Sequence, residues 1–475
     1  MRLPTHKTKI VCTIGPASRS ETILEALMLK GMNVARLNFA HGNMEGHKED
    51  IQRIRAVAAR LQRHCMIMAD LPGPKIRIGK LLHEPLLLEK GQEVVLTVKD
   101  RAGTPDRIPV EYKRLTESVR PGSLIFLNDG FIQLRVDKVS GDEVFCQTVI
   151  GGPLLSHKGL NLPGIEILAD AVSEKDLDFI AFALQEGVDV FGVSFVAKAD
   201  DILKVKKFSQ ERGRSARVIA KIERSEAVRN FDKILAAADG IMIARGDLGV
   251  QIPLEDVPAV QKKLIHQANL CGRPVITATQ MLLSMTENIR PTRAEVSDVA
   301  NAILDGTDAI MLSEETAIGR YPVEAVEMIS MIAMSTERER KAIKALADLR
   351  AYFRTSEVSC SSTVDDIVSL NAIEAADALN VRYILTDTKG RNTPSLISRF
   401  KPDCWILSCG SEDFLTLSYG AYPVPIDVQA NGRANMTIRL LVKTGMVEKD
   451  ERVILVEDES VSDMNEATSL TIFRF

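Results

Sequence analysis

Short apolar runs rich in β-branched residues alternate with longer amphipathic segments through the first two thirds of the chain. This alternation constrains the fold most strongly, because it is the pattern of strand–helix–strand units around a parallel sheet. The runs that qualify as strands are residues 9–15, 33–39, 65–71, 188–195, 217–223, 240–247, 274–280 and 308–315. Eight such units predict an α/β protein built on a (β/α)8 barrel, the TIM-barrel fold.

The gap between the third and fourth predicted strands is too long for one helix, so a further domain is inserted there. Residues 73–168 are rich in Gly and Pro and contain alternating pieces such as GQEVVLTVKD. They predict a small β-barrel domain inserted into a catalytic barrel of residues 1–72 and 169–340. The charged run STERERKAIKALADLR then predicts a solvated linking helix. Residues 356–475 alternate helix and strand again and predict a C-terminal α/β domain.

Composition excludes several classes of protein. The net charge of −4 leaves no excess of basic residues to attract nucleic acid or anionic lipid. No apolar run reaches the length of a membrane helix, and the first residues lack the apolar core of a signal peptide. The seven cysteines are scattered singly without a CxxC pair, which indicates buried reduced thiols. We therefore expect a cytoplasmic protein.

Almost every predicted barrel strand ends on a polar side chain. In a (β/α)8 enzyme the chemistry lies at the carboxyl ends of the strands, so these side chains are expected to meet. Each one alone could be a helix cap or a satisfied polar group, but eight strand ends together indicate a site. In chain order the side chains are Thr13, Arg36, Asn38, Asp70, Ser194, Lys221, Glu223, Asp247, Thr279 and Ser313.

The strand-end side chains have a common chemical theme. Glu223 and Asp247 are two acids for a hard divalent cation, and Mg²⁺ takes one or two protein carboxylates together with phosphate oxygens and water. Arg36 and Lys221, together with Arg77, are cations for anions, which suggests phosphoryl chemistry. In AKIERSE, Lys221 and Glu223 alternate in period two and can point to one face of the strand. The alternative is that these two residues form only a structural ion pair.

With these motifs in place, the sequence resembles pyruvate kinase. The matching stretches run in order from residue 8 to residue 322. They are TKIVCTIGPAS, MNVARLNFAHG, GPKIR, KGLNLPG, AVSEKD, AKIERSEAVRN, GIMIARGDLGVQIP, ATQML and RPTRAEVSDVANAILDGTDAIMLSEETAIGRYP. The family's fold is a (β/α)8 barrel with a mobile inserted β domain and a C-terminal α/β domain, usually in a homotetramer.

The resemblance implies transfer of the phosphoryl group of phosphoenolpyruvate to ADP. It assigns Glu223 and Asp247 to Mg²⁺, or Mn²⁺, and Lys221 to the phosphoryl group in flight and the enolate oxygen. Arg36 would hold the phosphate. Thr279 would relay a proton to the enolate carbon, and Ser313 would extend that relay. The backbone that would hold the substrate carboxylate, together with Thr279, is that of Ala244, Arg245, Gly246 and Asp247.

For the nucleotide, the resemblance points to the barrel and to the inserted domain. Lys158 of the inserted domain lies where a lid could bring it onto the ADP phosphates and exclude water. A lone His41 would be read as a surface histidine, but its NFAHG context favours a role in binding. The nucleotide residues implied are Thr13, Pro16, Asn38, His41, Arg77 and Lys158.

The stretch DLPGPK departs from the commonest pattern of the family. Many members have Asp-Thr-Lys-Gly-Pro-Glu there, and Ser in place of Ala40, and bind K⁺ at this place. In this chain the acid has become Lys75, and a retained K⁺ beside its ammonium would cost about 4 kcal/mol at 4 Å. We therefore predict that Lys75 replaces K⁺ beside Asn38, Asp70 and Leu71, so that K⁺ is not required. The alternative is a Lys75 that faces solvent.

Two other departures, Glu314 in the eighth strand and Arg224 after Glu223, have no functional interpretation. The turn in LTDTKGRNTPSLISRF matches the place where relatives bind a phosphorylated effector. The acidic end of the chain disfavours fructose 1,6-bisphosphate as the effector and favours AMP or a sugar monophosphate. The alternative for the turn is an ordinary capped turn that binds no effector. The candidates for effector binding are Thr386, Thr388, Lys389, Arg391 and Thr393.

Two rival functions fit parts of the sequence. One is an aldolase that uses Lys221 as a Schiff base, which needs a lowered lysine pKa although acids nearby favour the charged form. The other is a non-catalytic metabolite sensor that keeps the barrel and binds an effector in its C-terminal domain. The intact set of strand-end residues argues against the sensor.

Overall fold

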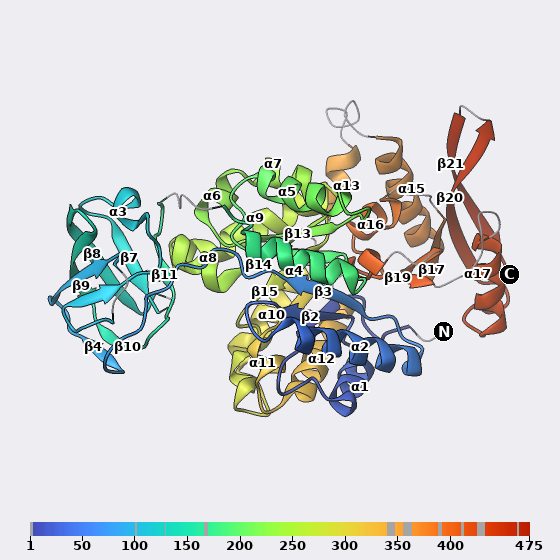
Figure 1. Cartoon of the computed structure of the whole chain (residues 1–475). Coiled ribbons are helices and arrows are strands. Elements are labelled where there is room, and N and C mark those ends of the chain that lie inside the picture. The colour runs from blue at the N-terminus through green and yellow to red at the C-terminus, as the bar shows by residue number, and fades with distance from the viewer. Residues whose placement is uncertain are drawn as a thin grey trace.

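The computed structural model describes residues 3–99, 102–128, 130–165, 170–339, 347–354, 363–387, 392–409, 413–424, 433–462 and 465–475. It consists of three bodies in a row, with the inserted domain and the C-terminal domain at opposite ends of the central barrel (Figure 1). The predicted fold class is confirmed, since a closed parallel barrel, a separate β domain and a C-terminal α/β domain are all present.

The eight predicted barrel strands are confirmed, and all of them are shorter than predicted. Neighbouring strands pair in parallel and close through β1 and β16. The eighth strand stops at Leu312 because Glu314 already begins helix α11. The barrel strands are β1 (Lys9–Thr13), β2 (Val34–Asn38), β3 (Met66–Asp70), β12 (Val190–Val193), β13 (Arg217–Ile222), β14 (Gly240–Ala244), β15 (Val275–Ala278) and β16 (Ala309–Leu312).

Helices surround the barrel and bury their apolar faces on its outer surface. Local signals fix their ends: α1 begins after a Ser20 cap and ends at Gly31, and α10 begins with a capping box of Thr292 and Glu295. The helices are α1 (Glu21–Lys30), α2 (Met44–Leu61), α4 (Glu174–Gln185), α5 (Ala199–Gln210), α6 (Ser225–Arg229), α7 (Phe231–Ala237), α8 (Arg245–Gln251), α9 (Val257–Leu270), α10 (Arg293–Asp305), α11 (Glu314–Ala317) and α12 (Pro322–Glu339).

The inserted domain is a six-stranded sheet of order β11-β7-β8-β9-β5-β6 with a small β10-β4 pair. Arg77 bridges to Gly159 beside β11, and Ile78 bridges to Val110 beside β6, so this short segment links the two edges in the manner of a barrel. Its elements are β4 (Leu86–Leu88), β5 (Glu93–Thr97), β6 (Arg107–Pro109), α3 (Leu115–Ser118), β7 (Leu124–Leu127), β8 (Ile132–Ser140), β9 (Glu143–Ile150), β10 (Gly152–Leu154) and β11 (Leu160–Asn161).

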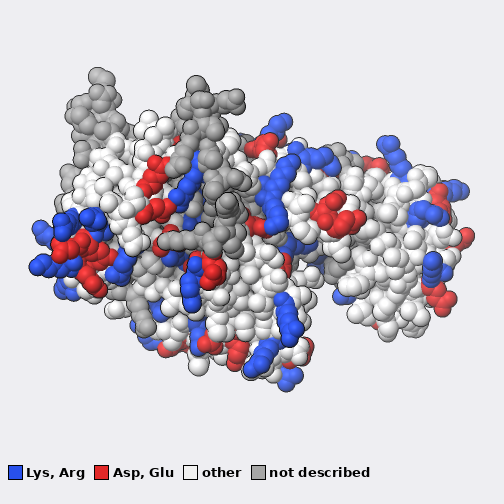
Figure 2. Space-filling model, turned by 180° about the vertical axis from the view of Figure 1, so that it is seen from behind, with Lys and Arg blue, Asp and Glu red and all other residues white. Residues whose placement is uncertain are grey.

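The C-terminal domain is a five-stranded sheet of order β19-β18-β17-β20-β21, in which only the last pair is antiparallel. Its elements are α13 (Ala347–Arg354), α15 (Val364–Leu379), β17 (Tyr383–Asp387), α16 (Thr393–Ser398), β18 (Trp405–Cys409), β19 (Ala421–Val424), α17 (Arg433–Lys443), β20 (Arg452–Ser462) and β21 (Asn465–Arg474). Among the described residues, no helix is both long and apolar enough to cross a bilayer. Figure 2 shows acidic and basic side chains interspersed over the face it presents.

Candidate active site

Lys221 is the centre of a buried cluster at the carboxyl ends of the barrel strands. Its Nζ lies 3.0 Å from Glu223 Oε1 and 3.2 Å from Asp70 Oδ1. The same ammonium donates a hydrogen bond of 2.7 Å to Ser194 Oγ. The predicted convergence of strand-end side chains is therefore present, with contributions from β3, β12 and β13.

The cluster keeps Lys221 charged. Burial by itself lowers the pKa of Lys221, but the carboxylates of Asp70 and Glu223 outweigh burial and raise the net pKa. Lys221 and Glu223 do form the ion pair that the alternative interpretation predicted. The Lys221 ammonium is also ion-paired with Asp70, so the contact is part of a larger cluster. A lysine with a raised pKa is a poor Schiff-base nucleophile, which counts against the aldolase.

Arg36 extends the cluster toward β1. Its Nε lies 2.5 Å from Asp70 Oδ2, and its Nη1 donates to Thr13 Oγ1 over 2.7 Å. Burial alone would raise the pKa of Asp70, but the charges of Arg36 and Lys221 lower it. Asp70 therefore stays ionised and holds both cations of the cluster in place.

Glu223 and Asp247 fit the ligand preference of Mg²⁺. Both are hard carboxylates at adjacent strand ends, and Glu223 also accepts a hydrogen bond of 2.6 Å from the Phe195 backbone N–H. Burial raises the pKa of Glu223; the Lys221 charge opposes this rise and the Asp247 charge adds to it. In the part of the chain that the structure describes, no group of three or more Asp, Glu, His or Cys could hold a metal alone. Two carboxylates with further positions left to substrate and water are what Mg²⁺ takes.

The start of α8 and the end of β15 form a backbone cradle. Thr279 has a left-handed φ of 71°, which is rare for a β-branched residue and typical of functional sites. Its Oγ accepts a hydrogen bond of 2.8 Å from the Gly246 N–H. The Arg245 guanidinium is held by Asp298 at 2.7 Å through both terminal nitrogens, so Arg245 offers its backbone to the cradle.

A cavity of about 1200 Å³ lies between the barrel and the inserted domain. On the barrel side it is lined by Asp247, Thr279 and Ser313, and on the inserted domain by Phe131, which is 74% exposed. Glu314, which had no interpretation, is exposed and also lines this cavity. The cavity has room for a substrate that contacts both domains.

The residues implied for the nucleotide form two separate groups. Asn38, His41 and the exposed Pro16 lie on the barrel, where Asn38 Oδ1 accepts from the Ala40 N–H. Arg77 and Lys158 lie on adjacent segments of the inserted domain, and Arg77 Nη1 donates to the His157 carbonyl over 2.8 Å. Between these two groups the structure gives no hydrogen bond or ion pair within the described ranges, so it does not bring them together.

The predicted contacts of Lys75 are wrong. Its Nζ lies 3.3 Å from Asp247 Oδ1 rather than beside Asp70 and Asn38, and the side chain is 31% exposed. The reason is that Arg36 and Lys221 already occupy the two carboxylate oxygens of Asp70. The alternative of a lysine that simply faces solvent does not hold either, because Lys75 is ion-paired at the edge of the site.

Of the predicted effector residues, Thr388, Lys389 and Arg391 lie outside the described residues. Thr386 lies near the carboxyl end of β17, and Thr393 is the first residue of α16. Both hydroxyls are buried and have no hydrogen-bond partner within the described part of the chain. Nothing in the structure tests the effector assignment itself.

Sequence reasoning gave Ser194 no role, although it stands in the series of strand ends. Its Oγ donates to the Leu71 carbonyl over 2.6 Å while accepting from Lys221, so it fixes the ammonium to β3. Asp298, which holds Arg245, was also missed, because no local signal indicates a contact over 53 residues. Arg224, which had no interpretation, is buried, and its guanidinium lies 5.4 Å from the centroid of the Phe195 ring.

Comparisons with known proteins agree over the whole length. Residues 5–326 match the family described as Pyruvate kinase, barrel domain, and residues 366–472 match Pyruvate kinase, alpha/beta domain. A pyruvate kinase of Thermococcus litoralis is 48% identical over 479 residues, which cover 100% of both chains. One from Staphylococcus epidermidis is 42% identical over 458 residues, covering 95% of this chain and 77% of that protein. A crystal structure of a pyruvate kinase from Cryptosporidium parvum has a TM-score of 0.91 at 34% identity and covers 99% of this chain and 96% of its own.

Proposed function

Because the chain belongs to the pyruvate kinase family, we propose that Glu223 and Asp247 hold a Mg²⁺ ion in its active site. Family membership supplies the activity, phosphoryl transfer between phosphoenolpyruvate and ADP. The observation that carries the assignment of residues is the buried Lys221 cluster at the strand ends, beside the Glu223–Asp247 carboxylate pair. A bound Mg²⁺, or Mn²⁺, would neutralise phosphate and carboxylate charge of the substrate.

Lys221 and Arg36 act on the transferred group. Both cations are held by Asp70 in a water-poor site, where charge interactions are stronger than in solvent. Lys221 stabilises negative charge on the phosphoryl group in flight and on the enolate oxygen left behind. Arg36 orients the phosphate before transfer.

The cradle at α8 binds the substrate carboxylate and positions Thr279. The backbone from Ala244 to Asp247 presents N–H groups at the start of α8, which favour an anion, and the Gly246 N–H would exchange its bond to Thr279 Oγ for the carboxylate. Thr279 Oγ lines the cavity and donates to the Ala278 carbonyl over 2.6 Å, and the hydroxyl would exchange this bond for the substrate in a proton relay. Ser313, on the same cavity, extends this relay to the enolate carbon.

ADP binds between the barrel group of Thr13, Pro16, Asn38 and His41 and the inserted domain. Closure of the inserted domain would bring Arg77 and Lys158 onto the nucleotide phosphates. The 1200 Å³ cavity between the two bodies supports this proposal, since it leaves space for the movement. Closure also excludes water that would otherwise take the phosphoryl group.

We also propose that the enzyme does not require K⁺. The oxygens that the resemblance assigns to K⁺ already have partners. Asp70 Oδ2 accepts a hydrogen bond from Arg36 and its Oδ1 is ion-paired with Lys221, while the Leu71 carbonyl accepts from Ser194 and Asn38 Oδ1 accepts from the Ala40 N–H. Lys75 adds a further positive charge at the neighbouring Asp247. These contacts, rather than the predicted position of Lys75, support independence from K⁺.

Regulation, assembly and location are proposed from the resemblance. The buried, unpartnered hydroxyls of Thr386 and Thr393 support an effector with hydrogen-bonding phosphate oxygens at the turn after β17. The six cysteines within the described residues are free thiols, which supports a cytoplasmic location. A homotetramer stays a prediction.

One coupled assay of phosphoenolpyruvate and ADP turnover tests the proposal. We expect activity with Mg²⁺, loss of activity after chelation, and equal rates in K⁺-free, Na⁺-free buffer and in KCl. Activity without K⁺ below about a tenth of that with K⁺ would contradict the cation proposal. A panel of phosphorylated effectors in the same assay tests regulation.

A further inference from the structure

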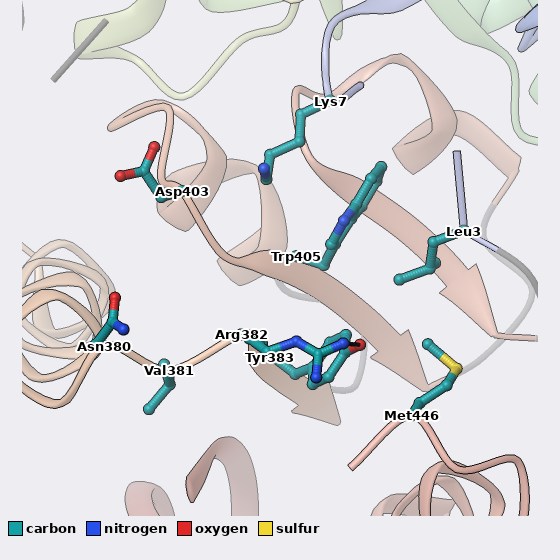
Figure 3. Close-up of a pocket in the computed structure, with 9 residues that line it drawn as sticks. All are labelled: Leu3, Lys7, Asn380, Val381, Arg382, Tyr383, Asp403, Trp405 and Met446. Atoms are coloured by element: carbon teal, nitrogen blue, oxygen red, sulfur yellow. Dashed lines mark hydrogen bonds between the residues drawn. The ribbon is translucent and has the colours of Figure 1, made fainter. Parts of the chain in front are cut away.

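A second cavity, of about 520 Å³, opens at the amino ends of the C-terminal strands. Tyr383 begins β17 and Trp405 begins β18, whereas the predicted effector turn follows Asp387 at the other end of β17. Lys7, from the segment that leads into β1, closes the cavity from the barrel side (Figure 3). The volume is that of an ordinary small-molecule site.

Positive charge converges on this cavity from two domains. In Figure 3 the Lys7 side chain extends into the cavity from above and Arg382 from below. The Arg382 side chain is 55% exposed. Its Nη1 lies 3.5 Å from Glu451 Oε1 and its Nη2 donates to the Tyr383 hydroxyl over 2.9 Å, and these two contacts fix the guanidinium. A guanidinium has five N–H donors, so Arg382 can keep its contacts with Glu451 and Tyr383 and still donate to a phosphate from its remaining N–H groups.

The indole of Trp405 forms one wall. Trp405 is the single tryptophan of the chain and is only half-buried. The Nζ atoms of Lys7 and Lys9 lie 5.6 and 5.5 Å from its ring centroid. An aromatic wall beside cations is the arrangement on which nucleobases stack.

The polar edge of the cavity supplies acceptors for a base. Asp403 and Asn380 are exposed and lie on the side of Trp405 where Lys7 lies (Figure 3). Carboxylate and amide oxygens accept hydrogen bonds from the exocyclic amine of a base.

We propose that this cavity binds an amino-substituted purine nucleoside monophosphate. The base stacks on Trp405, its amine donates to Asp403 or Asn380, and the phosphate lies between Arg382 and Lys7. Binding here does not depend on the proposed mechanism, because none of these side chains belongs to the barrel site.

Trp405 fluorescence tests the site in the full-length protein. We expect AMP to change the emission of the single tryptophan saturably, with calorimetry giving the same dissociation constant. Because IMP carries a carbonyl where AMP carries the amine, IMP should bind at least about threefold more weakly. Adenosine and inorganic phosphate should each bind at least about tenfold more weakly than AMP, since each lacks one half of the contacts.

Three charge-removing variants locate the binding. Lys7→Gln and Arg382→Gln should each weaken AMP at least about fivefold, because each removes one charged contact to the phosphate. Arg439→Gln, which removes an exposed charge from α17 of the same domain, should bind AMP like the unaltered protein. Thermal unfolding midpoints check that all three variants are folded. Absence of both a saturable emission change and binding heat at millimolar AMP would overturn the proposal, as would equal AMP affinity in all three variants.

Discussion

The mouth of the barrel and the junction of the barrel with the C-terminal domain each bury a lysine, with opposite consequences. Lys221 lies among Asp70, Glu223 and Ser194, and its pKa is raised. Lys9, at the start of β1, donates to the Ala421 carbonyl over 2.6 Å, and its pKa is lowered to about 7. Burial lowers both pKa values, so the neighbouring carboxylates decide the net direction.

The comparison separates a catalytic charge from a structural one. At the barrel mouth two carboxylates within 3.2 Å keep the ammonium charged wherever the enzyme works. At the junction the acids Glu337 and Asp308 raise the pKa of Lys9 too little to offset burial. The charge of Lys221, which every catalytic cycle needs, is held by direct ion pairs, whereas the charge of Lys9 at the junction depends on pH.

Removing the catalytic charge should have the largest effect. We expect Lys221→Met to lower kcat by at least about 10²–10³-fold, because a cation that meets developing negative charge is lost. The variant also leaves Glu223 buried without its cation, so a loss of about 3–5 kcal/mol in stability is expected. Steady-state kinetics and denaturant unfolding measure the two effects. Lys263→Met, at an exposed lysine of α9, should change neither, and equal kcat values in the two variants would refute the assignment.

Replacing Asp70, one of the two acids beside Lys221, should lower the pKa of Lys221, as burial lowers that of Lys9. Asp70→Asn removes a partner of both Lys221 and Arg36, so the pKa of Lys221 should fall. We expect about a tenfold to hundredfold loss in kcat/KM and an alkaline limb of the pH–rate profile that moves to lower pH. Asp200→Asn, at an exposed residue of α5, is the matched control. An alkaline limb at an unchanged pH would show that Asp70 does not sustain the charge.

The junction lysine should make stability depend on pH. Below about pH 7 Lys9 is charged in both the folded and the unfolded chain, so the fold bears the full cost of burying that charge. Between that pH and the ordinary lysine pKa, the unfolded chain binds more protons, so stability should rise with pH by up to a few kcal/mol. Lys9→Met should abolish this rise. Denaturant midpoints followed by Trp405 emission, which senses Lys9 at 5.5 Å, provide the measurement.

The control for this pH effect is Lys443→Met, at an exposed lysine of α17. It should keep the rise between about pH 7, the lowered pKa of Lys9, and the ordinary lysine pKa. If Lys9→Met and Lys443→Met show the same pH dependence, another group causes it.

The fold and the centre of the site could be predicted because their signals are local. Strand periodicity predicts all eight barrel strands, and the barrel rule predicts that Lys221, Glu223 and Asp70 lie together. The role of Ser194 could not be predicted, because its bond to the Leu71 carbonyl depends on the contact of β12 with β3, 123 residues apart. Side-chain direction across such contacts is set by packing rather than by spacing.

Lys75 is a second residue whose side-chain direction could not be predicted from the sequence. A substitution at Lys75 is expected to have the smallest effect of those considered. The sequence showed a charge change of two units relative to the common pattern, but the competition of Arg36 and Lys221 for Asp70 directs the ammonium to Asp247 instead. Lys75→Glu should make activity rise about tenfold with K⁺, because the added acid restores demand for a cation. Lys80→Glu, an equal charge change on an exposed residue of the inserted domain, should remain indifferent to K⁺. If Lys75→Glu responds no more to KCl than Lys80→Glu, then the side chain at position 75 does not set the cation requirement, and the occupied oxygens of Asp70, Leu71 and Asn38 alone account for independence from K⁺.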